Sequence, residues 1–453
     1  MAYNFYRCDA EQGFLLPPFV RDWLPAGDFF WFVIDAVGEF DLSKFFKKYR
    51  DDGVGHAAFD PKMMVTLLIY SYSVGERSSR KIESLCERDI AFRSISGNLR
   101  PDHSSICRFR KDFEEEIAGL FLEVLRLCQE AKLTKAGVVA LDGTKIQGNA
   151  SLAANRTKES LEKEVLEILK EAKERDETED RAHGDKRGDE LPHGLQERNS
   201  RLNRIRECIE RLREKEVAKE EKLQKAQAER QAKEDQGQKV RGRKPKVAAE
   251  TKKPKANPTD PESRILKSGG KFLQGYNAQA VANEEQVILA AEITQEENDQ
   301  KQLHAMLEST SCNLTEIGQD GKIGIALADK GYSPEISNPN PVPGNAEIIV
   351  PPQAKDSQKD SPCPRGPIPG GATPVERMHR KLKTQRGKAL YKKRAQIIEP
   401  VFGQIKWCRR LSRFSRRGKK ACASEWKLMC AVHNLGKLWK KGWKSAKGAM
   451  GNE

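Results

Sequence analysis

Two short apolar runs, far apart in the chain, each end in an aspartate with a glycine close behind it. The first run, Val138–Leu141, leads into Asp142, and the second, Lys322–Ala328, leads into Asp329. Apolar runs of this length, rich in β-branched residues, predict buried strands that deliver each aspartate to the exposed edge of a sheet. The alternative is an Asp-Gly turn, which is common after any strand.

Further strand and helix patterns occur in the second half of the chain. Strands are predicted at Gly275–Asn283, Gln286–Thr294 and Ala346–Val350, and a helix at Asp299–Leu314. Without the stretch 156–261, the order is strand–strand–strand–helix–strand–strand–helix. The chain is therefore predicted to have an α/β fold.

The stretch 156–261 changes composition to Glu, Lys, Arg, Gln and Ala, and repeats its apolar residues at alternating spacings of four and three. The polar segment Asp176–Glu197 divides it, so we expect an antiparallel helical hairpin that serves a partner helix, a dimer contact or simple spacing. The heptad positions are Leu161, Val165, Ile168 and Ala172, then Leu202, Ile205, Ile209 and Leu212. After the hairpin, Arg241 and Arg243 stand in a motif like the core of an AT-hook, although a basic linker explains them equally well.

Residues 1–134 have mostly helical patterns. Asp60 before Pro61 is a typical helix start, and Asp102 begins a later helix that carries Arg108 and Arg110. Short helices with basic residues early in the last one indicate a helix-turn-helix-like DNA-binding domain. An ordinary helical bundle with a charged, solvated face is the alternative.

Positive charge is concentrated near the C-terminus. The chain has a formal net charge of +15, while residues 376–447 contain 23 Lys and Arg residues against three acids, a local net charge of +20. Such a field attracts nucleic acid, and no strongly amphipathic face favours a membrane instead. The ten cysteines form no Cys-x-x-Cys pair, and no signal or spanning segment is found. A cytoplasmic, nucleoid-associated protein is expected.

The segment Tyr391–Lys406 has one acid, Glu399, among basic and apolar residues. A lone carboxylate there either pairs with nearby Arg or Lys on a surface helix or serves a metal ion. Because Pro400 comes directly after it, we expect a break in the helix, with Glu399 at a kink or an N-cap, facing Asp142 and Asp329.

Three carboxylates brought together from distant segments would repel each other unless a cation joined them. Asp142, Asp329 and Glu399 with two Mg²⁺ ions would form an oxygen-only site suited to in-line phosphoryl transfer. Lys330 and Lys406 are candidates for holding the phosphodiester.

Here the chain resembles the DDE transposases of bacterial insertion sequences, and within the wider IS4/IS5 assemblage it is most similar to the IS1182-like group. The blocks that carry the resemblance begin at Leu141, Ala328 and Tyr391, with a closing helix at Val432–Trp439. The resemblance implies an RNase H-like catalytic core in residues 135–155 and 262–447, an N-terminal DNA-binding domain in 1–134, and the 156–261 hairpin as an insertion. The family's large insertion usually comes later in the chain, so the role of this one is not implied.

The resemblance also implies a reaction. Asp142, Asp329 and Glu399 would be catalytic and metal-binding, with Mg²⁺ as cofactor and Mn²⁺ as a substitute. The enzyme would cut double-stranded DNA at the terminal inverted repeats and join the freed 3′-hydroxyl to target DNA, as a homodimer on paired ends. The DNA-contacting residues implied here are Tyr391, Arg394 and Lys406. Arg409 and Arg410, in the basic C-terminal segment, are further candidates for DNA contact. The rival functions are an RNase H-like nuclease without strand transfer and an inactive, transposase-derived DNA-binding protein.

Overall fold

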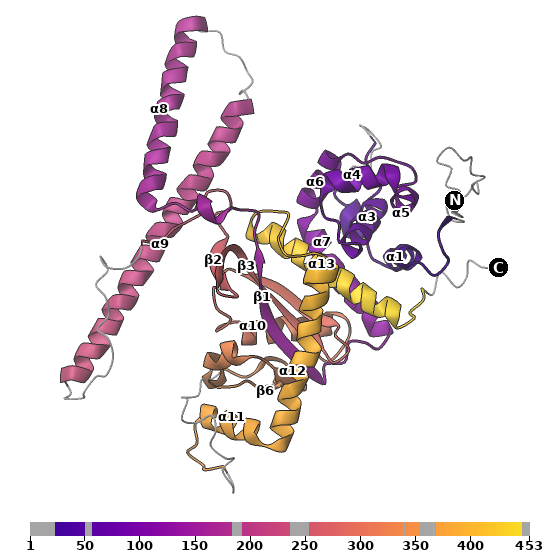
Figure 1. Ribbon diagram of the computed structural model, residues 1–453, viewed down its shortest axis with the longest axis vertical. Helices are drawn as coiled ribbons and strands as arrows, with labels where there is room; N and C mark the ends of the chain where they lie inside the picture. The colour runs from indigo at the N-terminus through magenta and orange to yellow at the C-terminus, as the bar shows by residue number, and fades with distance from the viewer. Residues whose placement is uncertain are drawn as a thin grey trace, which may run out of the picture.

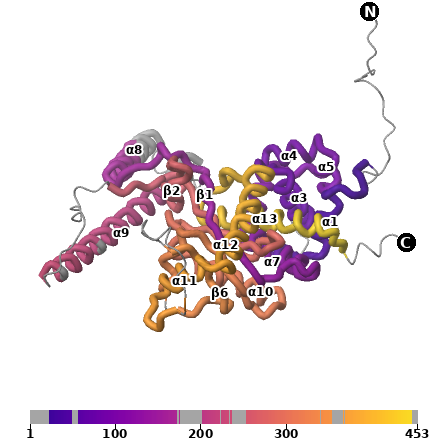
Figure 2. The backbone as a smooth tube through the Cα atoms, turned by 60° about the horizontal axis from the view of Figure 1, so that its bottom comes forward, coloured from indigo at the N-terminus to yellow at the C-terminus, as the bar shows by residue number. Residues whose placement is uncertain are grey.

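The computed structural model describes residues 23–49, 57–183, 193–235, 253–338, 340–352, 366 and 368–445. It is a mixed α/β structure in which helices surround one sheet, while a pair of long helices projects away from the rest (Figures 1 and 2). Arg241 and Arg243, in the AT-hook-like motif, lie outside the described residues. No helix in the described ranges is long and apolar enough to cross a lipid bilayer.

The sheet has six strands in the order β2-β3-β1-β5-β6, with β4 also paired to β3. The central strand β1 is antiparallel to β3 and parallel to β5, and β5 is parallel to β6. This mixed arrangement fits an RNase H-like core. The bounds are β1 Val138–Gln147, β2 Arg264–Ser268, β3 Lys271–Asn283, β4 Ile288–Thr294, β5 Ile325–Leu327 and β6 Glu347–Ile349.

Strand β2 was not predicted, and β3 begins four residues earlier than expected. The two strands form a hairpin in which Ser268 pairs with Lys271 across Gly269 and Gly270. Both glycines have positive φ, 54° and 80°, as a two-residue hairpin turn requires. The Gly-Gly pair was therefore the sequence signal for this hairpin.

The N-terminal region is helical, as predicted, and Asp60 and Asp102 cap their helices by accepting backbone hydrogen bonds from Lys62 and Ser105. Its helices are α1 Phe29–Gly38, α2 Ser43–Phe46, α3 Pro61–Ser73, α4 Ser79–Arg88, α5 Ile90–Ile95, α6 His103–Asp112 and α7 Glu114–Glu130. The remaining helices of the core are α10 Leu303–Glu316, α11 Pro374–Lys383, α12 Gln385–Gly403 and α13 Lys419–Lys440.

Helix α13 joins the N-terminal helices to the sheet. It lies beside α7 and β4 (Figure 1), and a single hydrophobic cluster runs from the N-terminal helices through α13 to the strands. Asn434 on α13 pairs with β4 through the backbone N–H and carbonyl of Ile288, at 2.8 Å each. The Trp426 indole donates to the Gln279 carbonyl at 3.1 Å. The predicted closing helix thus packs against both the N-terminal helices and the sheet.

His433, beside Asn434, gives the fold a pH-dependent stability. Burial, together with the nearby cations Arg409, Lys437 and Lys440, lowers the pKa of His433 from 6.5 to about 3. Between these values the unfolded chain binds a proton that the folded chain does not, so stability is complete above pH 6.5 and falls as the pH drops below it. Each pH unit costs up to about 1.4 kcal/mol.

We therefore expect the free energy of unfolding to fall by about 2 kcal/mol more between pH 7 and pH 5 in the natural chain than in His433→Gln. Glutamine retains an N–H donor for the Gln286 carbonyl, which His433 binds at 2.9 Å. Urea unfolding at the two pH values measures the difference. Equal losses in the two proteins would contradict the assignment.

The projecting pair consists of α8, Lys158–His183, and α9, His193–Asp235. It packs through the predicted heptad positions Leu161, Ile205, Ile209 and Leu212, with Cys208. The polar loop predicted at Asp176–Glu197 is wrong at both ends, because charged residues with good helix propensity extend both helices into it. The insertion leaves and rejoins the core at one place, where Arg156 and Ala256 exchange backbone hydrogen bonds of 2.9 and 3.0 Å.

Candidate active site

The parallel pairing of β1 with β5 places the two aspartates next to each other. Ala140 is opposite Leu327 in the ladder, and each aspartate comes two residues after its strand partner. Asp142 remains within β1, while Asp329 follows β5 and accepts a 2.7 Å hydrogen bond from the Gly331 backbone. Two residues far apart in the sequence thus meet where β5 ends beside the middle of β1.

Helix α12 adds the residues of the Tyr391–Lys406 segment. The Arg394 guanidinium donates to Asp142 Oδ2 at 3.0 Å and to Glu399 Oε1 at 3.4 Å. The Glu399 side chain is 60% exposed, whereas those of Arg394 and Asp142 are 16% and 22% exposed. The cation that links two of the predicted acids in this structure is therefore an arginine.

The expected direct meeting of the three carboxylates is not found. No group of three His, Cys, Asp or Glu side chains within the described ranges is arranged to hold a metal ion. The Glu399 carboxylate instead accepts a 3.4 Å hydrogen bond from Arg394, five residues earlier on the same helix, while the rest of its side chain is mostly exposed.

The prediction of a helix break at Pro400 is wrong. Helix α12 continues through Pro400 to Gly403 and passes into a π-helical turn, Gln404–Cys408. Proline has no N–H to give to the carbonyl of Gln396 four residues earlier. That carbonyl instead accepts a 3.0 Å hydrogen bond from the Gln286 side chain, which comes from the turn between β3 and β4.

Asp142 lies in a poorly solvated environment. Burial raises its pKa to about 6, against the lowering effects of the Gly143 N–H and of Arg394, and nearby Asp329 raises it further. Burial lowers the pKa of Lys406, which Asp142 partly restores. The pKa of Tyr391 is also raised by burial, with Arg394 opposing and Asp329 reinforcing the effect. These shifts place Tyr391, Arg394 and Lys406 around the two aspartates.

A fourth carboxylate, Asp299, was missed as a site residue. Its Oδ1 accepts hydrogen bonds from Asn277 at 2.6 Å, from Gln279 at 2.7 Å and from Lys145 at 3.3 Å. A Cβ on Gly331 would lie 2.9 Å from Asp329 Oδ1 and 3.7 Å from Asp299 Oδ2. Asp299 is therefore close to Asp329, although the sequence placed it at the start of a helix that in fact begins at Leu303.

The same network explains Gly143. A Cβ at this position would lie 2.2 Å from Gln279 Nε2 and 2.6 Å from Asp299 Oδ1. The glycine after Asp142 is thus required by the packing of the polar side chains and forms part of β1, not a turn. Asn277 and Gln279, polar residues at alternate positions of the buried part of β3, were the sequence signal for this network.

The predicted DNA-contacting residues differ in their surroundings. Lys330, Arg108 and Arg410 are exposed, while Arg409 is half-buried beside α13. The prediction for Arg110 is wrong, because it is 6% exposed and its guanidinium donates to the Arg77 carbonyl at 2.8 Å. Its guanidinium lies over the Tyr72 ring, 5.5 Å from the ring centroid, inside the N-terminal bundle.

Two family models match the sequence, one before the strands of the sheet and one after them. A transposase domain (DUF772) matches residues 19–112, and a transposase DDE domain matches residues 372–439. The second match contains Tyr391, Arg394, Glu399 and Lys406, which approach the two aspartates. Both matches are to transposase domains, and together they support a DDE transposase of insertion sequences.

The match to the DDE domain supports a nuclease or transposase enzyme. Asp142 and Asp329 lie outside both matched ranges, so their assignment depends on the register of the sheet. Neither model separates the groups of the family, and the IS1182-like assignment stays a prediction. No curated protein and no solved structure matches the chain.

Proposed function

We propose that this transposase cuts double-stranded DNA at the ends of its element and joins the freed 3′-hydroxyl to target DNA. Asp142, Asp329 and Glu399 are the catalytic acids. The observation that carries the proposal is that Arg394 on α12 contacts Asp142 and Glu399, while Asp329 at the end of β5 lies within electrostatic reach of Asp142 and Arg394.

The donor set fits Mg²⁺, with Mn²⁺ as a substitute, because it consists of hard carboxylate oxygens. The raised pKa of Asp142 supports this fit, since a buried carboxyl group beside Asp329 gains from further positive charge. Asp142, Asp329 and Glu399 would hold the ions, which when bound supply charge stabilisation for phosphoryl transfer.

The cationic side chains near the acids and further out have separate proposed roles. Lys406 contacts the Lys145 carbonyl at 3.4 Å and lies within electrostatic reach of Asp142, so it is placed to hold the phosphate beside the cut bond. Arg394 orients Asp142 and Glu399, and Tyr391 lies beside it. Lys330, Arg410 and Arg108 are exposed and would contact the DNA backbone further out.

The test uses duplexes that carry the inverted repeat found beside the gene, either intact or already cut to expose a 3′-hydroxyl. With Mg²⁺, we expect nicking of the intact duplex at the repeat end and joining of the cut duplex to a plasmid. Cleavage without joining would show a nuclease, and DNA binding without either reaction would show an inactive derivative.

We further propose that the helical insertion supports pairing of two protomers on DNA ends. The bridge between Arg156 and Ala256 gives a deletion that preserves the core, namely removal of residues 158–254 with a short glycine link. Asp260 must be retained, because it accepts a 2.8 Å hydrogen bond from the buried Tyr276 hydroxyl.

For this deletion we expect a melting temperature close to that of the full chain, retained binding of a single end, and loss of the paired-end complex. Native gel electrophoresis and light scattering measure the last two. Unchanged end-pairing in a folded deletion variant would refute the role given to the insertion.

A further inference from the structure

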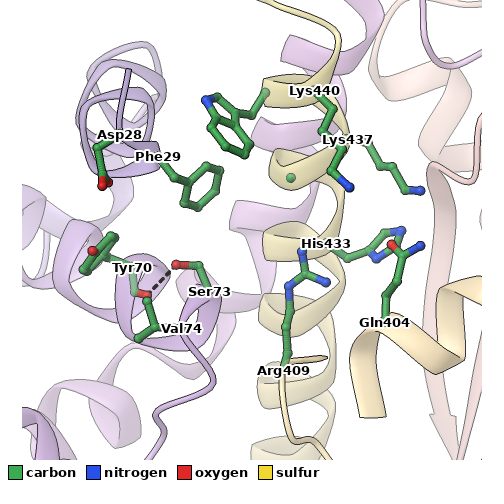
Figure 3. Close-up of a pocket in the computed structure, with 12 residues that line it drawn as sticks. Asp28, Phe29, Tyr70, Ser73, Val74, Gln404, Arg409, His433, Lys437 and Lys440 are labelled. Atoms are coloured by element: carbon green, nitrogen blue, oxygen red, sulfur yellow. Dashed lines mark hydrogen bonds between the residues drawn. The ribbon is translucent and has the colours of Figure 1, made fainter. Parts of the chain in front are cut away.

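A cavity of about 370 Å³ lies away from the acids, between the N-terminal helices and α13. Figure 3 shows Asp28, Phe29 and Tyr70 on one side and Arg409, His433 and Gln404 on the other. Its volume is within the range of small-molecule sites in proteins. None of the apolar side chains that line the cavity, and not its histidine, belongs to the proposed catalytic site.

One wall of the cavity is cationic without matching acids. Lys437 and Lys440 come from α13, and Arg409 follows the π-helical turn. Within the described part of the chain, no carboxylate forms an ion pair with Arg409, and burial lowers its pKa. On the opposite side, Asp28 already accepts the Phe30 N–H of its own helix at 2.8 Å. The wall therefore favours an anion.

Two polar atoms of this wall are buried and have no hydrogen-bond partner in the described structure, Arg409 Nε and His433 Nδ1. Because His433 Nε2 lies 2.9 Å from the Gln286 carbonyl, Nε2 carries the proton and Nδ1 is an acceptor. The side chain of His433 is fully buried. Neither atom reaches the surface of the cavity, so the anionic group of a ligand would contact the other nitrogens of the cationic wall, those of Arg409, Lys437 and Lys440.

Gly436 fixes the position of Arg409. A Cβ on Gly436 would lie 2.8 Å from Arg409 Nη2, so the absence of a side chain lets the guanidinium lie against α13. Aromatic rings line the rest of the cavity: Phe29 and Trp439 meet edge to face at 5.3 Å between ring centroids, and Tyr70 lies beside them. Rings of this kind bind planar bases by stacking.

We propose that this cavity binds a nucleotide, with its phosphate on Arg409 and the α13 lysines and its base against the aromatic rings. The nucleotide is either a free nucleoside phosphate or one unit of a DNA strand. Both present the same phosphate and base, and probes of each kind separate them. The proposal is independent of the assigned catalytic acids.

Binding is measured by calorimetry with the full chain in EDTA, so that metal-dependent catalysis plays no part. The probes are dAMP, deoxyadenosine and an eight-residue single-stranded oligonucleotide. Arg409→Ala removes the cation, and Gly436→Ala displaces it while changing only one methyl group. Arg88→Ala is the matched control, because it removes the same charge from an exposed residue that neither lines the cavity nor belongs to the proposed DNA contacts. Melting temperatures establish that each variant is folded.

We expect dAMP to bind, deoxyadenosine to bind much more weakly, and both Arg409→Ala and Gly436→Ala to weaken dAMP binding by at least about tenfold, with Arg88→Ala near the natural value. Binding of the oligonucleotide but not of dAMP, with the same dependence on Arg409 and Gly436, would assign the site to a DNA strand. Equal weakening by Arg88→Ala, equal binding of deoxyadenosine, or no binding of any probe would overturn the proposal.

Discussion

Asp142→Asn is expected to abolish DNA cleavage and strand transfer while DNA binding stays within a few-fold of the natural value. Asparagine keeps the shape of the side chain and removes the negative charge at the meeting point of β1, β5 and Arg394. The loss should be on the order of 10³-fold or more, the scale seen when a preorganised electrostatic group is removed from an active site. Gel assays of cleavage and of binding, on the same duplex, measure the two effects.

The matched control is Asp320→Asn. Asp320 is 63% exposed and forms an ion pair with Lys322, two residues along the chain. The same chemical change there should leave cleavage unaltered. Cleavage that survives Asp142→Asn would remove Asp142 from the catalytic set without touching the family assignment.

Glu425→Ala is expected to destabilise the protein by about 3–5 kcal/mol, since it leaves a mostly buried arginine without its partner. The Glu425 side chain is fully buried and accepts a hydrogen bond from Arg77 Nη1 at 3.0 Å. It also accepts the backbone N–H of Ser415 and of Arg416. Equilibrium unfolding in urea measures the loss.

Glu115→Ala is the control, because Glu115 also links α7 to α13, through Lys420, but both of these side chains are mostly exposed. Its removal should leave the free energy of unfolding close to the natural value, because exposed ion pairs contribute little. Similar losses of unfolding free energy in the two variants would mean that Glu425 does not hold the N-terminal and C-terminal helices together.

The strand register explains why the two aspartates could be found from the sequence. Buried parallel strands are short apolar runs, and the residues that come directly after neighbouring runs lie at the same edge of the sheet. Asp142 and Asp329 were therefore predictable without coordinates. The Tyr391–Lys406 segment was predictable by its resemblance to a family block. Both predictions depended on local sequence patterns alone.

The errors concern residues whose partners are distant in the sequence. Pro400 was expected to end its helix because the rule for proline considers only neighbouring residues. The carbonyl that loses its helical partner is bound by Gln286, which is distant in the sequence. Arg110 was placed on DNA because its charge is visible in the sequence, while its contacts with Arg77 and Tyr72 are tertiary. Asp299 was missed because its three donors come from β1 and β3.

The bridge between Arg156 and Ala256 has a consequence for how this chain tolerates change in length. The two residues are hydrogen-bonded neighbours, so whatever connects them begins and ends at the same point on the core. The entropy of closing such a connection rises only slowly with its length. The stability of the core should therefore depend little on the segment attached there. A foreign domain inserted at this position could replace the two helices without disturbing the sheet.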